Sequence, residues 1–467
     1  MESIIRDKIV EHMKNNNLFS KYQFGFISGR STVLQLLHVL NIWIEVLDQG
    51  GTLDAIYCDF MKAFDKVPHR RLVYKVEKYG IKGNVIGWIN SFLNERTQCV
   101  NINNHKSSFA PVTSGIPQGS VLGPILYVIY DLPEVINGGS LAFLFADDTK
   151  MFRQVKTTND LLVQQKDIEQ AVKWSNIWLL KFHPDKCVHL GIGSHRDSIK
   201  EYQPNLNGQP LKRKICEKDV EKKYENDLCQ HTYHYDMDGQ ILKRSKVEKD
   251  IGVNIDNELN FKTHINSIVK KANRVMGITR RTFTNLNSEV FLPIFKSLVR
   301  PHLEYAAPVW SPHLADLNKK VEDVQRRATK KLPGMKDLTY PARLHKLRLP
   351  TLAYRRVRGD MIQTFKLLMP IEKGAYDRSL PKLLKLKSDL GIRDVGGQND
   401  KQLYKGHVNH NLAKYSFNFR VSKLWNSLPQ HIIDAPTVKA FEIALDKHWE
   451  NQPLMFDDYE SEIVVRR

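Results

Sequence analysis

Residues 141–152 read LAFLFADDTKMF, two short apolar runs on either side of a pair of aspartates, Asp147 and Asp148. Apolar runs around a short polar break predict a β-hairpin whose tip carries the two acids. Clustered carboxylates repel one another, so buried strands seldom end in paired acids without a use for them. The stretch therefore indicates both a sheet and a functional edge of that sheet.

A second apolar run supplies a third acid. Residues 53–60 read LDAIYCDF and end almost directly in Asp59. If the two strands are neighbours, Asp59 and Asp147 converge on one edge of the sheet. Consecutive strand residues point to opposite faces, so the side chains of Asp147 and Asp148 point the same way only if the turn twists them. Oxygen ligands favour Mg²⁺, and two such ions about 3.5–4 Å apart would activate a 3′-hydroxyl and stabilise a leaving pyrophosphate. The three aspartates thus predict a two-magnesium site, and the alternative for the Asp147–Asp148 pair is an ordinary solvated turn.

A Gly/Pro-rich loop lies between these strands. Residues 114–124 read SGIPQGSVLGP, in which Pro117 stiffens the loop and Gln118 offers an amide in a constrained position. Its glycines permit close approach of the backbone to a ligand. The alternative interpretation is a turn that merely begins the next helix.

The order of the expected elements predicts an α+β fold, with helices packed on an antiparallel sheet. Helical spacing is found over residues 3–14, 31–48, 69–81, 84–94, 125–132, 161–180, 316–332 and 344–365. Residues 99–103 and 109–113 are expected to form a pair of strands, and residues 374–411 to form a loop. A final compact unit is expected to begin at residues 420–429.

Composition limits the class of protein. With 467 residues, of which 42% are hydrophobic and 26% charged, the chain has enough apolar content for two to four folded domains, which excludes a largely disordered protein. No apolar run is long enough to cross a bilayer, and the first residues do not resemble a signal peptide. The five cysteines are scattered, which favours reduced thiols in an intracellular protein and leaves nucleus and cytoplasm both open.

Basic charge is concentrated in one part of the chain. The formal net charge is +19, and residues 261–358 hold 21 Lys and Arg against 6 Asp and Glu, a local excess of +15. Such a patch is typical of polyphosphate binding, because each phosphate contact releases condensed counterions. A solvated basic surface is the alternative.

One segment is repeated. GQPLKRKICEKD at 208–219 recurs as GQILKRSKVEKD at 239–250, with eight of twelve positions identical. A single repeat indicates a duplicated hairpin or a splice of two related copies rather than a solenoid. Cys216, Cys229, His231 and His234 lie in and beside this region, but their spacing fits no compact zinc module.

The motifs together resemble the reverse transcriptases of retrotransposons without long terminal repeats, especially the jockey-like and chicken-repeat lineages. The resemblance rests on three central motifs, YCDFMKAFDKVPH, SGIPQGSVLGPILYVIY and FADDTKMF. Four further motifs extend it over nearly the whole chain: QFGFISGRST, LKFHPDKCVHLGIG, VEKDIGVNIDNELNFKTHI and RVSKLWNSLP. It implies a right-hand polymerase. Residues 1–50 would be partial fingers, 51–260 the palm with a duplicated insertion at about 205–250, 261–345 a helical basic thumb, and 346–467 a mainly helical C-terminal region.

The resemblance also assigns the acids and the residues beside them. Asp59 matches the first catalytic acid, Asp147 the second metal-binding acid and Asp148 its partner, and Phe60 would add a main-chain carbonyl to the metal shell. Phe64 matches the bulky residue beneath the incoming sugar, where a ring would clash with a 2′-hydroxyl, although simple core packing would also explain it.

Further residues would contact nucleotide or template. Pro117, Gln118 and Gly119 would line the pocket, Lys186 would sit near the triphosphate unless it is an ordinary surface lysine, and Arg30 would touch template or backbone. The implied partners are an RNA template, a DNA primer and dNTPs, with two Mg²⁺ ions as cofactor and no membrane.

Two departures from the family pattern favour a rival interpretation. The chain begins just before QFGF, which suggests an N-terminal truncation of the fingers, and the repeat falls where the primer-grip hairpin should be single. The alternative is therefore a catalytically inactive, truncated remnant that still binds nucleic acid. An intron maturase relative is disfavoured by the C-terminal tail.

Overall fold

The computed structural model describes residues 1–127, 131–193, 233–283, 286–369, 377, 380–392 and 398–464. The first copy of the repeat, 208–219, lies outside these residues, as do Cys216, Cys229 and His231 of the weighed zinc cluster. The second copy is described and forms three short strands: β10 (Gln240–Ile241), β11 (Lys243–Ser245) and β12 (Val247–Asp250).

Internal contacts divide the chain into two compact units. The first unit contains Met1–Phe26 and Gly51–Lys246, and the second contains Ile27–Gly50 and Val247–Arg467. Residues 27–50 thus belong with the C-terminal half of the chain rather than with the segments that flank them. The four-part division into fingers, palm, thumb and C-terminal region stays a prediction.

The first unit is built on a five-stranded sheet in the order β11-β8-β1-β7-β6. Its other strands are β1 (Thr52–Cys58), β6 (Leu141–Phe145), β7 (Asp148–Val155) and β8 (Val188–Ile192). The central strand β1 pairs antiparallel with both β7 and β8, and β6 and β7 form the expected hairpin. The edge strand β11 pairs parallel to β8, so the sheet is mixed at this edge rather than wholly antiparallel as expected.

The strand β1 carries one buried acid, Asp54, which is 3% exposed. A buried charge is costly unless it is paired and hydrogen-bonded. Here the Tyr235 hydroxyl donates to one carboxylate oxygen at 2.9 Å, and His189 Nε2 lies 2.9 Å from the other. One carboxylate oxygen of Asp54 is therefore hydrogen-bonded, and the other lies within ion-pair distance of the His189 ring.

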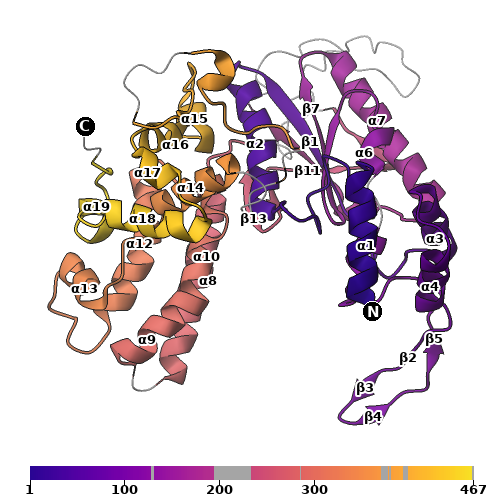
Figure 1. Ribbon diagram of the computed structural model, residues 1–467, viewed down its shortest axis with the longest axis horizontal. Helices are drawn as coiled ribbons and strands as arrows, with labels where there is room; N and C mark the ends of the chain where they lie inside the picture. Colours follow the sequence, from indigo (N-terminus) through magenta and orange to yellow (C-terminus); the bar gives the residue numbers. More distant parts are fainter. Residues whose placement is uncertain are drawn as a thin grey trace, which may run out of the picture. The chain divides into compact units, whose positions relative to one another are not determined.

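Helices cover the sheet of the first unit. The helix α7 (Thr158–Trp178) packs against β7 (Figure 1). A capping box between Thr157 and Asp160 begins this helix. The others are α1 (Glu2–Asn15), α3 (His69–Lys78), α4 (Asn84–Leu93), α5 (Gly123–Leu126), α6 (Leu132–Val135) and the 3₁₀ turn η1 (Pro184–Lys186). The helix expected over 125–132 is not continuous in its described part: α5 ends at Leu126, α6 begins at Leu132, and residues 128–130 lie outside the described residues.

Short hairpins complete the first unit. The strands β2 (Thr97–Gln98) and β5 (Ala110–Pro111) pair with each other, as do β3 (Asn101–Ile102) and β4 (His105–Lys106), while β9 (Asp236–Met237) pairs with β10. The predicted pairing of 99–103 with 109–113 was therefore wrong in its detail. One hairpin there is nested inside another.

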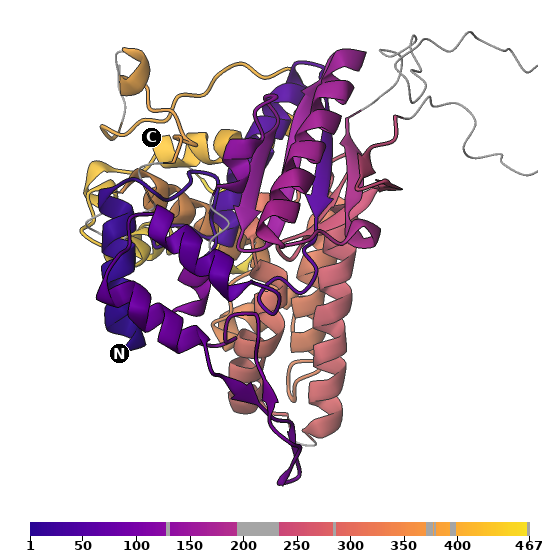
Figure 2. The same ribbon diagram turned by 90° about the vertical axis from the view of Figure 1, so that its right-hand side faces the viewer.

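The second unit is mainly helical. The helix α8 (Lys262–Thr282) packs against α12 (Ala315–Lys330) and α10 (Arg300–Glu304). Figure 2 shows α8 as a long helix. The remaining elements are α2 (Thr32–Asp48), β13 (Val253–Asp256), α9 (Ser288–Ile294), η2 (Phe295–Val299), α11 (Ala307–Trp310), α13 (Tyr340–Leu347), α14 (Leu352–Leu368), η4 (Ser388–Leu390), α15 (Asn411–Lys414), α16 (Phe417–Asn426), α17 (Gln430–Ile433), α18 (Val438–His448) and α19 (Pro453–Phe456).

The single helix expected over 344–365 is two helices. Arg348 adopts a left-handed conformation with φ 47° and ends α13, and α14 begins only after Pro350 and the cap Thr351. A residue that precedes proline disfavours helical backbone, which explains the break at this point. Among the described helices, none has a stretch apolar and long enough for a membrane span.

Candidate active site

The sheet of the first unit brings Asp59 and Asp147 to the same edge. Asp59 follows the last residue of β1, Cys58, which pairs with Thr149 of β7. Asp147 lies in the two-residue turn that joins Phe145 of β6 to β7. Because β1 and β7 are hydrogen-bonded neighbours, the end of one strand meets the start of the other, and the convergence expected from the sequence is confirmed for these two acids.

The two carboxylates influence each other. Burial raises the pKa of Asp147, and the nearby negative charge of Asp59 raises this pKa further. Asp59 Oδ2 is buried and accepts no hydrogen bond from the part of the chain that the structure describes, and Lys186 Nζ lies 3.4 Å from it. Two acids with one lysine beside Asp59 form a negatively charged edge that a divalent cation would stabilise.

Asp148 has a different environment. It is the first residue of β7, pairs with Phe145, and is exposed. Its neighbour Asp147 lies in the turn and is half-buried. Within the described residues, no three acidic, imidazole or thiol side chains converge on a single metal position. The residues present therefore fit a divalent cation that takes part of its shell from Asp59 and Asp147 and the rest from water and substrate, as Mg²⁺ commonly does.

The backbone after Asp59 directs a carbonyl to the same side. Phe60 forms an antiparallel bridge with Phe182, flanked by hydrogen bonds from His183 N to Asp59 O at 2.8 Å and from Met61 N to Lys181 O at 2.8 Å. In such a pair the N–H and C=O of the central residue point away from the partner strand. The Phe60 carbonyl is thus directed away from Phe182, toward the side on which β7 lies beside β1.

Phe64 is held by two aromatic contacts. Its half-buried ring stacks on Tyr127, with centroids 4.6 Å apart and planes 16° apart, and Phe26 meets it edge to face at 6.3 Å. Tyr127 is buried, and the pKa of its hydroxyl is raised by burial and by the charge of Asp147. The Phe64 ring therefore rests on a side chain that itself lies near one of the acids.

The Gly/Pro-rich loop is fastened to the segment that follows Asp59. Ile116 N donates to Phe64 O at 2.8 Å, and the Gln118 amide donates to Asp65 Oδ1 at 3.1 Å. Gly115 has φ +90°, and a side chain there would come within 2.7 Å of Asp65 O, so only glycine permits this approach. The structure thus brings Pro117, Gln118 and Gly119 beside Phe64, which the sequence could not determine.

The two predicted basic residues lie in different units. Lys186 ends η1 in the first unit, near Asp59, and its side chain is 62% exposed. Arg30 belongs to the second unit, where its side chain is 1% exposed and its guanidinium is paired with Asp377 at 2.8 Å. Arg30 therefore has an ion-pair partner inside its own unit, and its contact with template or backbone stays a prediction.

Three residues at this edge had no role assigned from the sequence. They are Gln23, whose side chain contacts Ala146 beside Asp147; Tyr127, beneath Phe64; and Cys187, whose Sγ accepts a hydrogen bond from Asp59 N at 3.3 Å. Gln23 lies in the QFGF motif, which could have drawn attention to it, whereas nothing in the local sequence distinguishes Tyr127 or Cys187 from core residues.

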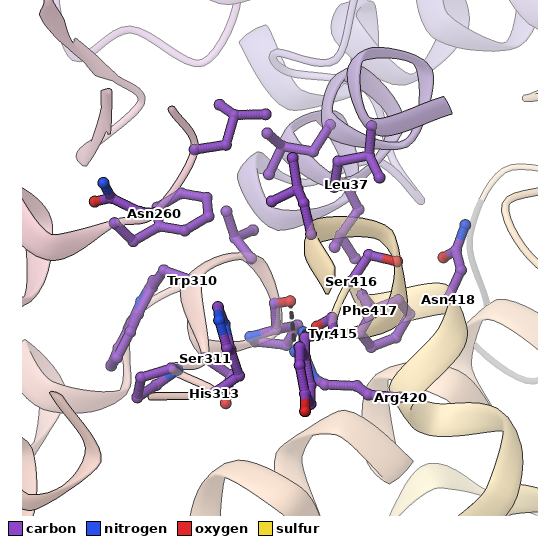
Figure 3. A pocket seen from close by; sticks show the side chains of 18 of the residues that line it. Leu37, Asn260, Trp310, Ser311, His313, Tyr415, Ser416, Phe417, Asn418 and Arg420 are labelled. Atoms are coloured by element: carbon purple, nitrogen blue, oxygen red, sulfur yellow. Dashed lines mark hydrogen bonds between the residues drawn. The ribbon is translucent and has the colours of Figure 1, made fainter. Parts of the chain in front are cut away.

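A cavity in the second unit offers less chemistry. It has a volume of about 50 Å³, room for a few water molecules, and its wall includes Trp310, His313 and Tyr415 (Figure 3). The rings of His313 and Tyr415 stack at 4.5 Å. The Arg420 guanidinium at its edge is already bound to Asp360 at 2.8 Å and to Pro308 O at 2.7 Å. The edge with Asp59 and Asp147 is therefore the stronger candidate.

Comparison with known proteins bears on this edge. The family described as Reverse transcriptase (RNA-dependent DNA polymerase) matches residues 1–235, half of the chain and all of the candidate site. The RNA-directed DNA polymerase from mobile element jockey of Drosophila melanogaster is 30% identical over 224 residues, which cover 45% of this chain and 24% of that protein. The probable RNA-directed DNA polymerase from transposon X-element of the same species is 24% identical over 371 residues, covering 75% and 36%.

The chain therefore spans about a quarter to a third of the length of these curated relatives. Among solved structures, apo telomerase from Candida tropicalis is similar over 74% of this chain and 54% of its own, with 10% identity and a TM-score of 0.40. The match over half the chain and the motifs that carry it confirm the jockey-like assignment made from the sequence. This protein belongs to the reverse transcriptase (RNA-dependent DNA polymerase) family.

Proposed function

We propose that the chain is an RNA-directed DNA polymerase of a non-LTR retrotransposon, which adds deoxynucleotides to a primer 3′-hydroxyl at the edge formed by Asp59 and Asp147. The observation that carries the proposal is the pairing of β1 with β7, which places these two acids beside each other. Family membership supports the same reaction. The activity is stated for this chain as a proposal because its relatives are longer proteins.

Asp59 and Asp147 would hold two Mg²⁺ ions together with the Phe60 carbonyl, and Asp148 would serve as their partner. Bound Mg²⁺ would lower the pKa of the attacking hydroxyl and neutralise the charge that develops on the phosphates. Two observations support this assignment. Asp59 Oδ2 has no hydrogen-bond donor among the described residues, and the raised pKa of Asp147 indicates a carboxylate that lacks sufficient positive charge nearby.

The other residues of the edge would bind and orient the nucleotide. Phe64, supported by Tyr127, would lie under the sugar and exclude a 2′-hydroxyl. Pro117, Gln118 and Gly119 would line the pocket, since their loop is hydrogen-bonded to the Phe64–Asp65 backbone and side chain. These contacts would convert binding energy into the alignment of the two reacting groups.

In the reaction, the primer 3′-hydroxyl would lose its proton to solvent water, and its oxygen would form a bond to the α-phosphorus of the dNTP as the bond from that phosphorus to pyrophosphate breaks. Lys186 Nζ would donate a proton to the departing pyrophosphate, because this exposed ammonium lies 3.4 Å from Asp59 and can reach bound phosphates. Basic residues of α8 and α12 in the second unit would bind the phosphates of template and primer without reading sequence.

Primer extension tests the proposal. The full chain would be given an RNA template, a DNA primer, dNTPs and Mg²⁺, and Asp147→Asn is expected to lower the extension rate by about a thousandfold, since a lost metal ligand removes several kcal/mol of transition-state stabilisation. Asp238→Asn is the matched control, because Asp238 is an exposed aspartate in the turn between β9 and β10. It should leave extension unchanged.

The rival interpretation, a catalytically inactive remnant that binds nucleic acid, makes the opposite prediction. The wild-type chain would bind an RNA–DNA hybrid in a filter assay but extend no primer at any Mg²⁺ concentration. The excess of basic charge in residues 261–358 is the observation that keeps this alternative in view. Extension that is equally fast in Asp147→Asn would exclude the polymerase assignment.

A further inference from the structure

The side chain of Gln23 is bound to the turn that carries Asp147. Its Nε2 donates to Ala146 O at 3.2 Å, and its Oε1 accepts from Ala146 N at 3.0 Å and from Gly25 N at 2.8 Å. Gln23 is 2% exposed, so water does not compete for these bonds. One amide therefore satisfies both main-chain groups of the residue that directly precedes Asp147.

The backbone around Gln23 continues this contact. Phe24 N donates to Leu144 O at 2.7 Å, and Leu144 N donates to Tyr22 O at 2.9 Å, so residues 22–24 pair with β6 just before its turn. Gln23 itself forms a parallel bridge with Leu144. The segment thus lies along β6, and its glutamine reaches the point where the backbone leaves the strand.

The turn needs such support because of its own conformation. Ala146 has φ +58°, in the left-handed region that L residues adopt with strain and glycine adopts freely. Strained residues of this kind persist where surrounding contacts determine their position, and they are frequent at functional sites. Here the contacts come from Gln23, which lies 123 residues away in the sequence.

Gly25 makes the approach possible. A Cβ at this position would lie 2.3 Å from Ala146 N, closer than non-bonded atoms come, and both atoms that would collide belong to the backbone. Any side chain would therefore push residues 22–25 away from the turn. The same hydrogen bonds would then lengthen or break.

We infer that Gln23 and Gly25 act as a clamp that fixes the turn at Ala146 and so positions the Asp147 carboxylate for metal binding. Gln23 is a positioning residue, since its amide binds the main chain of Ala146 and would act on Asp147 through it. The inference rests on the proposed function, because it takes Asp147 as a metal ligand.

The test measures Mn²⁺ binding to the full chain without nucleic acid, by the loss of the free Mn²⁺ signal in electron paramagnetic resonance. Gln23→Met keeps side-chain volume but removes the amide, and we expect the Mn²⁺ dissociation constant to rise about tenfold. Gly25→Ala, which breaks the same contact from the backbone side, should raise it similarly and serves as the second variant if Gln23→Met does not fold.

The matched control is Gln165→Met. Gln165 also bridges both main-chain groups of one residue, donating to Asp236 O at 2.9 Å and accepting from Asp236 N at 2.9 Å, but it does so at β9, which carries none of the proposed metal ligands. This variant should bind Mn²⁺ like the wild type, even if its thermal unfolding midpoint falls as much as that of Gln23→Met.

A second substitution tests the physical cause. In an Ala146→Gly background the left-handed turn no longer strains the chain, so Gln23→Met should weaken Mn²⁺ binding by only about threefold. An equal effect in both backgrounds would overturn the clamp, as would wild-type affinity in Gln23→Met or an equal loss in Gln165→Met. Absence of specific Mn²⁺ binding in the wild type would instead overturn the metal site of the proposed function.

Discussion

Phe64 is the residue at which packing and proposed specificity coincide. Its ring is fixed by Tyr127 on one face and by Phe26 at an edge, so it cannot swing away from a nucleotide sugar without losing both contacts. A ring held in this way would reject a 2′-hydroxyl by steric clash, whereas a mobile ring would yield to it.

Phe64→Val should therefore relax sugar selection. The ratio of kcat/KM for dGTP to that for GTP is expected to fall by about 100-fold, mainly through a gain for GTP, because removing ring volume makes room for the hydroxyl. Phe92→Val is the control, since Phe92 also belongs to a stacked pair, with Trp88 on α4. If the ratio is the same in Phe64→Val and the wild type, Phe64 serves only the core.

His264 predicts a pH dependence of stability in the second unit. Burial, with a smaller contribution from Lys271, lowers its pKa from 6.5 to about 4, and its Nδ1 accepts a hydrogen bond from Asn254 N at 3.2 Å. Between pH 6.5 and 4 the unfolded chain binds a proton that the folded chain does not. The contribution of His264 to the free energy of unfolding is therefore fully present above pH 6.5 and falls as the pH is lowered toward 4.

The expected loss from His264 across that window is up to about 3 kcal/mol. His264→Gln keeps an acceptor for Asn254 but does not titrate, so the difference in unfolding free energy between wild type and variant should shrink toward pH 4. Denaturant titrations at pH 4, 5, 6 and 7 would measure it. If the unfolding free energies of the two proteins change with pH in parallel, the prediction is contradicted. The pKa of His38 is also lowered to about 4, but His38 is present in both proteins and contributes equally to both curves.

The acids of the site were predictable because their signal is local. Asp59 and Asp147 each end or interrupt an apolar run, and that pattern survives without knowledge of the fold. The contacts of Gln23 with Ala146 and of Arg30 with Asp377 join residues 123 and 347 positions apart. The spacing of apolar residues carries no information about such pairs, so neither contact was predicted from the sequence.

At the scale of elements, a buried glutamate joins two helices of the second unit. Glu322 on α12 is 0% exposed, and its carboxylate accepts from Leu352 N at 2.9 Å, from Ala353 N at 3.2 Å and from the Tyr340 hydroxyl at 2.6 Å. The first two donors are among the N–H groups that α14 leaves unpaired at its start. A side chain from one helix thus caps another.

Glu322→Ala should destabilise the chain by about 2–4 kcal/mol, because it leaves buried N–H and hydroxyl groups without acceptors. The neighbouring Asp323→Ala removes only a partly exposed ion pair with Arg326, 3.6 Å apart, and should change the unfolding free energy by less than about 0.5 kcal/mol. Denaturant unfolding followed by circular dichroism measures both. Equal effects of the two substitutions would rule out the capping role.

Helices and strands were predicted correctly where the spacing of apolar residues determines them, and they were missed where the conformation of a turn determines them. The helices α2, α7 and α12 and the β6–β7 hairpin lie close to their expected limits. The break between α13 and α14 depends on a left-handed Arg348, and the parallel pairing of β11 depends on where the chain returns to the sheet. Hydrophobic spacing contains neither piece of information.

At the scale of the whole molecule, two separate segments of the chain form the second unit. Residues 27–50 join that unit although both flanking segments belong to the first. The helix α2 contacts α11 and α15, its Trp43 is fully buried, and the Asp48 carboxylate accepts from Asn409 N at 2.9 Å and His410 N at 2.8 Å at the start of α15. No single boundary drawn along the sequence separates the two units, because residues 27–50 lie between two segments of the first unit.

A fragment of residues 247–467 should therefore be incomplete. Without α2 it exposes the apolar surface that covers Leu34, Leu37 and Leu40, each worth about 1.5–3 kcal/mol when buried, and it leaves the start of α15 uncapped. We expect its thermal transition to be broad and shifted to lower temperature.

Adding a peptide of residues 27–50 should restore a cooperative transition whose midpoint rises with peptide concentration, because a ligand of the folded state stabilises it by mass action. A peptide with Trp43→Ala should restore far less, since it leaves a cavity where a fully buried ring belongs. A fragment that unfolds cooperatively at the same temperature with and without the peptide would show that α2 is dispensable, and residues 27–50 would then belong with the segments beside them in the sequence.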